Sequence, residues 1–286
     1  MKRKNWLLAM GILVLFISCE KELSVENGAI DDELIVGVDC RIRKIVYTDT
    51  AGNANIGLGS IAATINSTDV VTMITRFDSL ASTIEFIGTP TYTNDSVYIN
   101  PDEYFVVDVN KRITKLHGLE DPTDPFSLQF DVFYQYSATG NLVAKNYFLS
   151  IAPTIQVYRV DYIYTGGNLT RMVRTNLATG DFESDADLEY YTNIIPRRYL
   201  YIFPDENAYA PYTQFFNFGT RNYNAIKKIK VRNYDPGNVV RDSIVSTFSN
   251  YIMSRDNYVL HVQMGGNAQP SIPALAGKLS FNYRCR

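Results

Sequence analysis

The feature that most constrains the fold of this chain is an alternation of apolar and polar residues with a period of two. Between Phe126 and Tyr136, apolar side chains occupy every second position and mainly polar ones lie between them. Successive side chains of a β-strand point to opposite faces of a sheet, so this pattern predicts a strand with one buried face. Tyr158–Tyr164 repeats the alternation, and Thr165–Asn168 then turns the chain into Leu169–Arg174. This arrangement predicts a β-hairpin.

Similar β-rich runs, separated by turn residues, occur along the rest of the chain. They are Arg41–Thr48, Val70–Phe77, Tyr104–Val109, Arg112–Leu116, Leu142–Ser150, Tyr199–Phe203, Ile226–Arg232, Tyr258–Met264 and Leu279–Tyr283. Short strands at this spacing favour an antiparallel meander, a sandwich or an open barrel over a parallel sheet with crossover helices. A helix over Asn207–Phe216 would be restricted by Pro211 to a short turn-like element. The sequence therefore predicts an all-β, mainly antiparallel fold with at most short helices.

The N-terminus has the pattern of an export signal. A cationic start, Lys2–Lys4, precedes the apolar run Trp6–Phe16. That run is shorter than the roughly 20 residues that a membrane-spanning helix requires. The tetrapeptide Phe16–Cys19 resembles a bacterial lipobox, which implies cleavage before Cys19 and attachment of diacylglycerol to its thiol. The alternative is a secretion signal that is cut elsewhere.

This interpretation divides the chain into three parts. Residues 1–18 are a lipoprotein signal peptide, residues 19–33 are a flexible tether, and residues 34–286 form a single antiparallel β domain. The tether is assigned because its residues are polar, acidic and without a period. Acyl chains on Cys19 would insert into a membrane at roughly 0.8 kcal/mol per buried CH₂ and hold the β domain beside it. We expect an outer-membrane lipoprotein of the bacterial envelope, facing either the periplasm or the cell surface.

Two further cysteines, Cys40 and Cys285, lie near opposite ends of the predicted β domain. In an oxidising envelope they could form a disulfide that joins the first strand to the last. The alternative is two separately buried thiols, each acting as a small hydrophobic residue.

Composition and charge argue against several classes of function. The chain has 27 Lys and Arg against 30 Asp and Glu, a formal net charge of −3, so it lacks the basic field that binds nucleic-acid phosphates. Its two histidines, His117 and His261, have no cysteine or histidine nearby at metal-ligand spacing. The Gly-x-Ser-x-Gly motif of serine hydrolases is absent from the sequence. We therefore expect no enzyme activity, no cofactor and no nucleic-acid partner.

An acidic segment offers a weak calcium-binding candidate. Asp181, Glu183, Asp185 and Asp187 occupy alternate positions after Gly180. Carboxylate oxygens at this spacing could gather around Ca²⁺. We favour the interpretation that these carboxylates form the solvated face of a loop and of the start of a strand. The order of glycine and ligand residues found in known calcium loops is missing here. No metal is assigned.

The abundant tyrosines make carbohydrate binding possible. An aromatic ring can stack on a sugar face while its hydroxyl supplies a polar contact. Tyr209 and Tyr212 are the candidate ligand-facing aromatics, because their Pro-containing segment is expected to be a surface loop. The alternative is a purely structural use of these rings.

Three stretches, Tyr104–Leu116, Phe130–Tyr147 and Tyr158–Val173, are similar strand–turn–strand units with aromatic-rich alternation. Within the third, Tyr162–Thr170 resembles the tyrosine–aspartate repeat of Rhs-type proteins, with a threonine at the aspartate position. Over residues 40–286 the chain resembles secreted Bacteroidetes lipoprotein families of unknown function, and Glu20–Glu22 resembles their acidic surface-export signal. The resemblance implies an antiparallel β protein on the cell envelope and supplies no catalytic residues.

These observations predict a lipid-anchored, non-catalytic envelope protein that binds or presents a glycan or protein ligand at the cell surface. Its partners would be the membrane, through the lipid anchor, and a glycan or an envelope protein. One alternative is a secreted carbohydrate-active hydrolase, which requires a pair of carboxylates about 5–10 Å apart in a cleft. Another is a purely structural subunit of an envelope complex.

Overall fold

The computed structural model describes most of the chain from Cys40 onward. The described ranges are 40–49, 59–68, 70–78, 83–119, 127–205, 210–269 and 272–285. The predicted signal peptide (residues 1–18), Cys19, the tether (residues 19–33) and Tyr209 lie outside the described residues. Within these ranges, no helix has the length and apolar character needed to cross a membrane.

The described chain consists of β-strands and one short helix. In order they are β1 (Cys40–Asp49), β2 (Gly59–Ile65), β3 (Val71–Asp78), β4 (Thr83–Gly88), β5 (Thr91–Tyr92), β6 (Ser96–Asn100), β7 (Glu103–Val107), β8 (Ile113–Leu119), β9 (Gln129–Tyr136), β10 (Leu142–Leu149), β11 (Ala152–Thr165), β12 (Asn168–Asn176), β13 (Phe182–Tyr190), α1 (Ala210–Thr213), β14 (Ile226–Asp235), β15 (Val239–Met253), β16 (Val259–Gln269) and β17 (Ile272–Cys285). The predicted all-β, mainly antiparallel fold is confirmed. The helix α1 is a single turn that contains Pro211, as expected from the limits that proline imposes.

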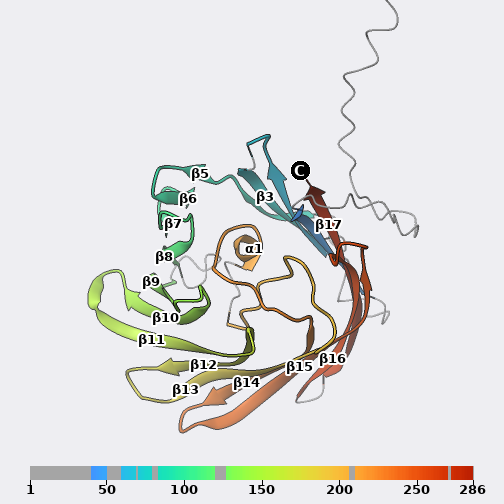
Figure 1. The fold of residues 1–286 in the computed structure, drawn as a ribbon. Helices are drawn as coiled ribbons and strands as arrows, with labels where there is room; N and C mark the ends of the chain where they lie inside the picture. Colours follow the sequence, from blue (N-terminus) through green and yellow to red (C-terminus); the bar gives the residue numbers. More distant parts are fainter. Residues whose placement is uncertain are drawn as a thin grey trace, which may run out of the picture.

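The strands form an antiparallel meander that nearly closes on itself. From β5 to β17 each strand pairs with the next, and β1 to β4 do the same. The last strand, β17, pairs with β1 and places Cys285 opposite Cys40. On the other side of the ring, β4 pairs with β3 and β5 with β6, and only Thr89 and Pro90 separate β4 from β5. Figure 1 shows the resulting ring of strands.

The inner face of this sheet is apolar. In β9, Phe130, Val132 and Tyr134 are buried, whereas Phe133 and Gln135, on either side of Tyr134, are exposed. Residues directly opposite one another on paired strands lie on the same face, so the register carries this inward face from strand to strand. The predicted alternation is therefore explained by a sheet whose buried side lines the barrel.

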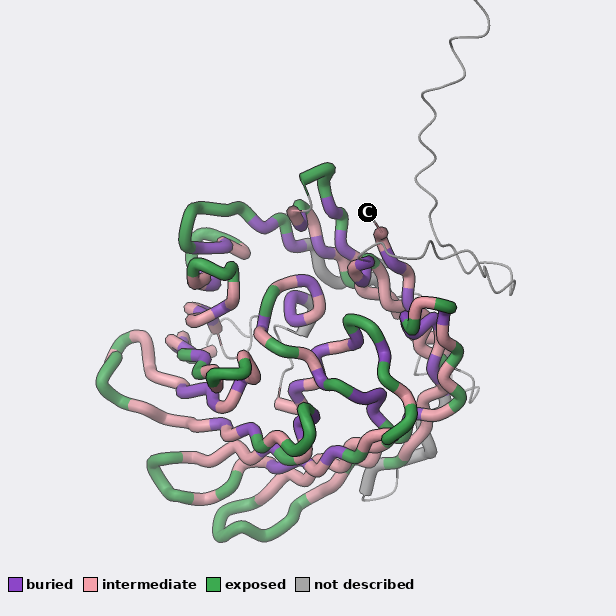
Figure 2. The backbone as a smooth tube through the Cα atoms, viewed as in Figure 1, coloured by how far each residue is buried: buried purple, intermediate pink, exposed green. Residues whose placement is uncertain are grey.

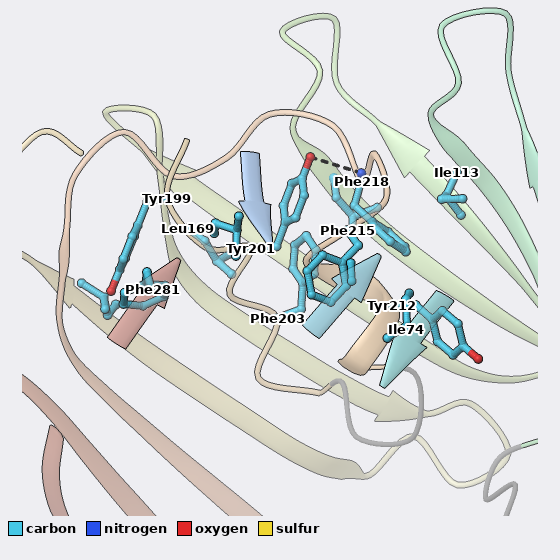
Figure 3. Close-up of a cluster of buried hydrophobic side chains, with 14 of the residues drawn as sticks. Ile74, Ile113, Leu169, Tyr199, Tyr201, Phe203, Tyr212, Phe215, Phe218 and Phe281 are labelled. Carbon is cyan, nitrogen blue, oxygen red and sulfur yellow. Dashed lines mark hydrogen bonds between the residues drawn. The ribbon is translucent and has the colours of Figure 1, made fainter. Parts of the chain in front are cut away.

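A long connection between β13 and β14 fills the barrel. We call it the inner segment (residues 191–205 and 210–225), and it runs with α1 inside the ring of strands (Figures 1 and 2). It supplies six of the buried aromatic side chains of the core, shown in Figure 3: Tyr199, Tyr201, Phe203, Tyr212, Phe215 and Phe218.

These aromatic rings contact the barrel wall on several sides. Ring centroids of the inner segment lie 6.0 Å from Phe105 on β7, 5.6 Å from Tyr134 on β9, 5.5 Å from Tyr162 on β11 and 6.2 Å from Phe281 on β17. Edge-to-face and tilted contacts at such distances add to the burial of the rings themselves. The segment is therefore the centre of the hydrophobic core.

Two expectations about the inner segment are wrong. Tyr199–Phe203 is not a strand, because its backbone lies inside the barrel and does not join the sheet. Tyr212 is 1% exposed and packs against Phe105 and Phe216, so it does not face a ligand from a surface loop. In both cases a run of aromatic residues is buried inside the ring of strands, where it removes apolar surface from water.

Candidate functional site

An open cleft with a volume of about 940 Å³ lies at the end of the barrel where β1 begins. Its walls come from the first residues of β1, from two stretches of the inner segment and from the turn between β15 and β16. Five arginines line it: Arg41, Arg197, Arg198, Arg221 and Arg255. Among the described residues of the lining, Asp256 is the one acidic side chain, which leaves a formal excess of four positive charges.

Arg221 ties the two stretches of the inner segment together beneath the cleft. Its guanidinium donates hydrogen bonds to the carbonyl of Tyr199 and, at 3.2 Å, to the carbonyl of Gln214. It also lies 4.1 Å from the centre of the Tyr201 ring. Burial lowers the pKa of Arg221 because desolvation penalises the charged form. This arginine is part of the framework of the cleft.

Tyr201 fixes the same two stretches through four hydrogen bonds. Its amide donates to Gln214 Oε1 at 3.0 Å, and its carbonyl accepts from Gln214 Nε2 at 2.8 Å. Its hydroxyl donates to the carbonyl of Gly219 at 2.8 Å and accepts from the amide of Phe218 at 3.3 Å, the bond drawn in Figure 3. The floor of the cleft is therefore held in one geometry by buried contacts.

The rim of the cleft carries the exposed arginines Arg197, Arg198 and Arg255. The amide of Arg197 donates to the carbonyl of Asn257 at 2.7 Å, which joins the inner segment to the β15–β16 turn. Tyr223, 56% exposed, lies in the same lining and adds an accessible aromatic ring. The rim thus combines guanidinium groups with a ring face.

Cys40 and Cys285 are joined at this same end of the barrel. Their sulfur atoms are 2.00 Å apart, and the bond links β1 to β17 next to Arg41. The amide of Cys40 donates to the hydroxyl of Tyr258 at 3.0 Å. Since Arg41 also donates to the carbonyl of Phe215 at 3.2 Å, the start of β1 is fixed against the inner segment.

The acidic residues of the calcium candidate lie elsewhere, on β13 and the turn before it. Arg232 contacts Asp185 at 2.6 Å and Asp187 at 2.7 Å, and these two carboxylates raise its pKa through hydrogen bonds and charge. Glu183 accepts a hydrogen bond from Asn176 at 3.0 Å. In the part of the chain that the structure describes, His, Cys, Asp and Glu form no group of three that could hold a metal ion. The carboxylates are used in cross-strand pairs on the outer face, and Asp181 lies in the preceding turn.

A buried ion pair connects the inner segment to the barrel wall. Lys145 Nζ on β10 lies 3.1 Å from Asp205 Oδ2, and both side chains are 0% exposed. The Tyr162 hydroxyl donates to the other Asp205 oxygen at 2.7 Å. The ammonium also lies 5.5 Å from the centre of the Tyr134 ring and 5.3 Å from that of Phe203. No sequence pattern pointed to this pair, because its partners lie far apart in the chain.

Comparisons with known proteins identify a shared fold and show no family. No protein-family model and no curated protein matches the chain. A porin-like protein from Bacteroides uniformis ATCC 8492 is similar in structure, with a TM-score of 0.57 and 10% identity over 86% of this chain and 98% of that one. A porin-like protein from Bacteroides vulgatus ATCC 8482 is also similar, with a TM-score of 0.53 and 12% identity over 85% of this chain and 98% of that one. At these identities the likeness shows a shared fold: a nearly closed antiparallel barrel.

Proposed function

We propose that this chain is a lipid-anchored, non-catalytic protein of the bacterial envelope that binds a glycan in its arginine-lined cleft. The barrel serves as a rigid, packed support for that cleft. The observation that carries the proposal is the cleft itself, an open site with a fixed floor and a rim of accessible arginines and Tyr223.

The faces of the barrel support a scaffold rather than a channel. Barrels that span outer membranes have an apolar outer band and a polar interior. Here the interior holds the aromatic inner segment, whereas the outer face of β13 and β14 carries ion pairs such as Lys228–Glu189 at 3.1 Å. A fold shared with porin-like proteins is thus used, in this proposal, for a water-facing body.

The lining of the cleft favours binding over hydrolysis. A glycosidase of the usual kind needs two carboxylates on either side of the scissile bond, and the described lining contains one, Asp256. The cleft volume lies within the range of small-ligand sites, and its mixture of aromatic rings and polar groups suits a sugar.

The connectivity of the chain supports the proposed lipid anchor at Cys19. The chain leaving Cys19 reaches the described body at Cys40, whose neighbour Arg41 lines the cleft. A lipid on Cys19 would therefore hold the protein from the end that carries the binding site. Whether that end lies in the periplasm or outside the cell depends on export.

The three strand–turn–strand units predicted from the sequence share one structure. Each of the three strand–turn–strand units is a hairpin in the sheet, namely β7–β8, β9–β10 and β11–β12. We propose that their similarity to Rhs-type repeats reflects this shared hairpin unit. No activity follows from it.

A chain that carries Cys19→Ala, and a cleavable secretion signal in place of residues 1–18, should be released from membranes, because it has neither the lipid nor the apolar run Trp6–Phe16. Without the acyl chains, the remaining attraction between an acidic body and a lipid surface is weak. Membrane fractionation and intact mass of the mature protein measure the effect. A variant that stays in the membrane fraction, or a wild-type protein of unmodified mass, would rule out the lipid anchor.

Replacing Tyr223 by alanine should weaken glycan binding about tenfold, because the variant loses a stacking surface without disturbing the core. The wild-type mature chain is first screened on a broad glycan array, and affinities for the best ligand are then measured by calorimetry. Phe133→Ala is the matched control, since Phe133 is 41% exposed on the outer face of β9. An absence of array signal would leave the structural-subunit alternative.

A further inference from the structure

We infer that the cleft selects acidic glycans, oligosaccharides that carry carboxylate or sulfate groups. This inference rests on the proposed glycan-binding function and adds the chemical class of the ligand.

The first support is the contrast between the cleft and the rest of the molecule. The whole chain has a formal charge of −3, yet the cleft lining carries five arginines and one aspartate. A concave site lined by one sign of charge concentrates its field and draws in ligands of the opposite sign. A neutral sugar would gain hydrogen bonds but no long-range attraction from this charge, whereas an anionic one would also be attracted from solution.

The second support is that arginines elsewhere on the barrel are paired with carboxylates. Arg159 pairs with Asp161 at 2.8 Å, Arg241 with Asp242 at 2.9 Å, and Arg232 with two carboxylates of β13. In the described part of the chain, Arg197 and Arg255 form no ion pair. Their guanidinium groups therefore keep donors that a ligand can use.

The third support is the geometry of the donor groups. A guanidinium presents two parallel N–H groups that match a carboxylate or sulfate in a bidentate contact. Arg197 and Arg255 come from different segments, and the bond from the Arg197 amide to the Asn257 carbonyl holds these segments together. The arginines are thus set on a fixed frame, which favours a ligand with more than one anionic group.

A sugar fits the cleft better than a phospholipid headgroup does. Tyr223 and Asn257 are exposed beside the arginines, and they offer a ring face and an amide for hydroxyl groups. A phosphatidylglycerol headgroup also carries hydroxyl groups, but it has no sugar ring that could stack on Tyr223. We therefore assign an acidic glycan, and membrane binding becomes an outcome of the test.

The experiment measures the affinity of the mature chain for matched oligosaccharides. An array with uronate, sialate and sulfated members and their neutral counterparts identifies the best pair, which is then titrated at low and high salt. We expect the acidic member to bind at least about tenfold more tightly, and this preference to shrink with salt. Arg197→Gln and Arg255→Gln should each weaken binding of the acidic member about five- to tenfold.

Arg241→Gln is the matched control, because it removes the same charge at the other end of the barrel. Arg241 lies near the start of β15 and Arg255 just beyond its end, so they are roughly 45 Å apart along an extended strand. Equal affinity for acidic and neutral members, unchanged in the arginine variants, would overturn this inference and leave glycan binding intact. Binding of no glycan would overturn both proposals. Binding to phosphatidylglycerol vesicles without binding to acidic glycans would also overturn the inference, in favour of a membrane headgroup.

Discussion

Replacing Asp205 by alanine is expected to lower the free energy of unfolding by about 3–5 kcal/mol. The substitution leaves the Lys145 ammonium inside the barrel without the carboxylate that lies 3.1 Å from it, with both side chains at 0% exposure. It also removes the acceptor of the Tyr162 hydroxyl. Urea unfolding followed by fluorescence and circular dichroism measures the change.

The matched control replaces both partners by apolar residues of similar size, as Lys145→Met with Asp205→Leu. This double variant should recover most of the lost stability, because neither charge of the pair then remains in the core. Tyr162→Phe should have a smaller effect, about 1 kcal/mol for one hydrogen bond. A loss below about 1 kcal/mol in Asp205→Ala would mean that the inner segment is not fastened to the wall through this pair.

Removing the disulfide, by Cys40→Ala with Cys285→Ala, is expected to lower the free energy of unfolding by about 3–5 kcal/mol. The bond closes a loop with a sequence separation of 245, so its loss frees a large part of the unfolded chain. The folded sheet should remain, because β1 and β17 still pair along their length.

The comparison needs equilibrium unfolding of the wild type with and without reductant, alongside the double variant. Reductant should shift the wild-type midpoint to that of the variant and leave the variant unchanged. An identical midpoint for the oxidised and reduced wild type would show that the link does not contribute to stability.

The strands with clear alternation could be predicted from the sequence. β9 and the β11–β12 hairpin appear where the period of two and the Gly-containing turn placed them. These strands have one face against the core and one toward solvent, which is the condition that produces the pattern. By contrast, β13 alternates with carboxylates on its outer face, and its short inward residues Ser184 and Ala186 gave little apolar signal.

The interior of the barrel could not be predicted from local pattern. Tyr199–Phe203 has the composition of a buried strand, but burial alone does not distinguish a strand from an extended segment packed inside a sheet. Its place depends on closure of the sheet, which is set by the pairing of β17 with β1 at the two ends of the described chain.

The arginine-lined cleft could not be predicted from the sequence for a related reason. The arginines of the cleft belong to three separate parts of the chain: the start of β1, the inner segment and the β15–β16 turn. Among these arginines, only Arg197 and Arg198, directly after Pro196, are adjacent in the sequence. A cluster assembled by tertiary contacts leaves no spacing motif to recognise.

The sheet encloses a packed apolar core, and we propose that it meets water on its outer face. The most direct measurement uses the Cys19→Ala protein freed of residues 1–18 and purified without detergent. It records the solubility of this protein, its unfolding and its effect on the conductance of a planar bilayer. We expect this protein to stay in solution without detergent, to unfold in one cooperative transition and to add no conductance. A protein that precipitates without detergent and produces stepwise channel currents would contradict this proposal.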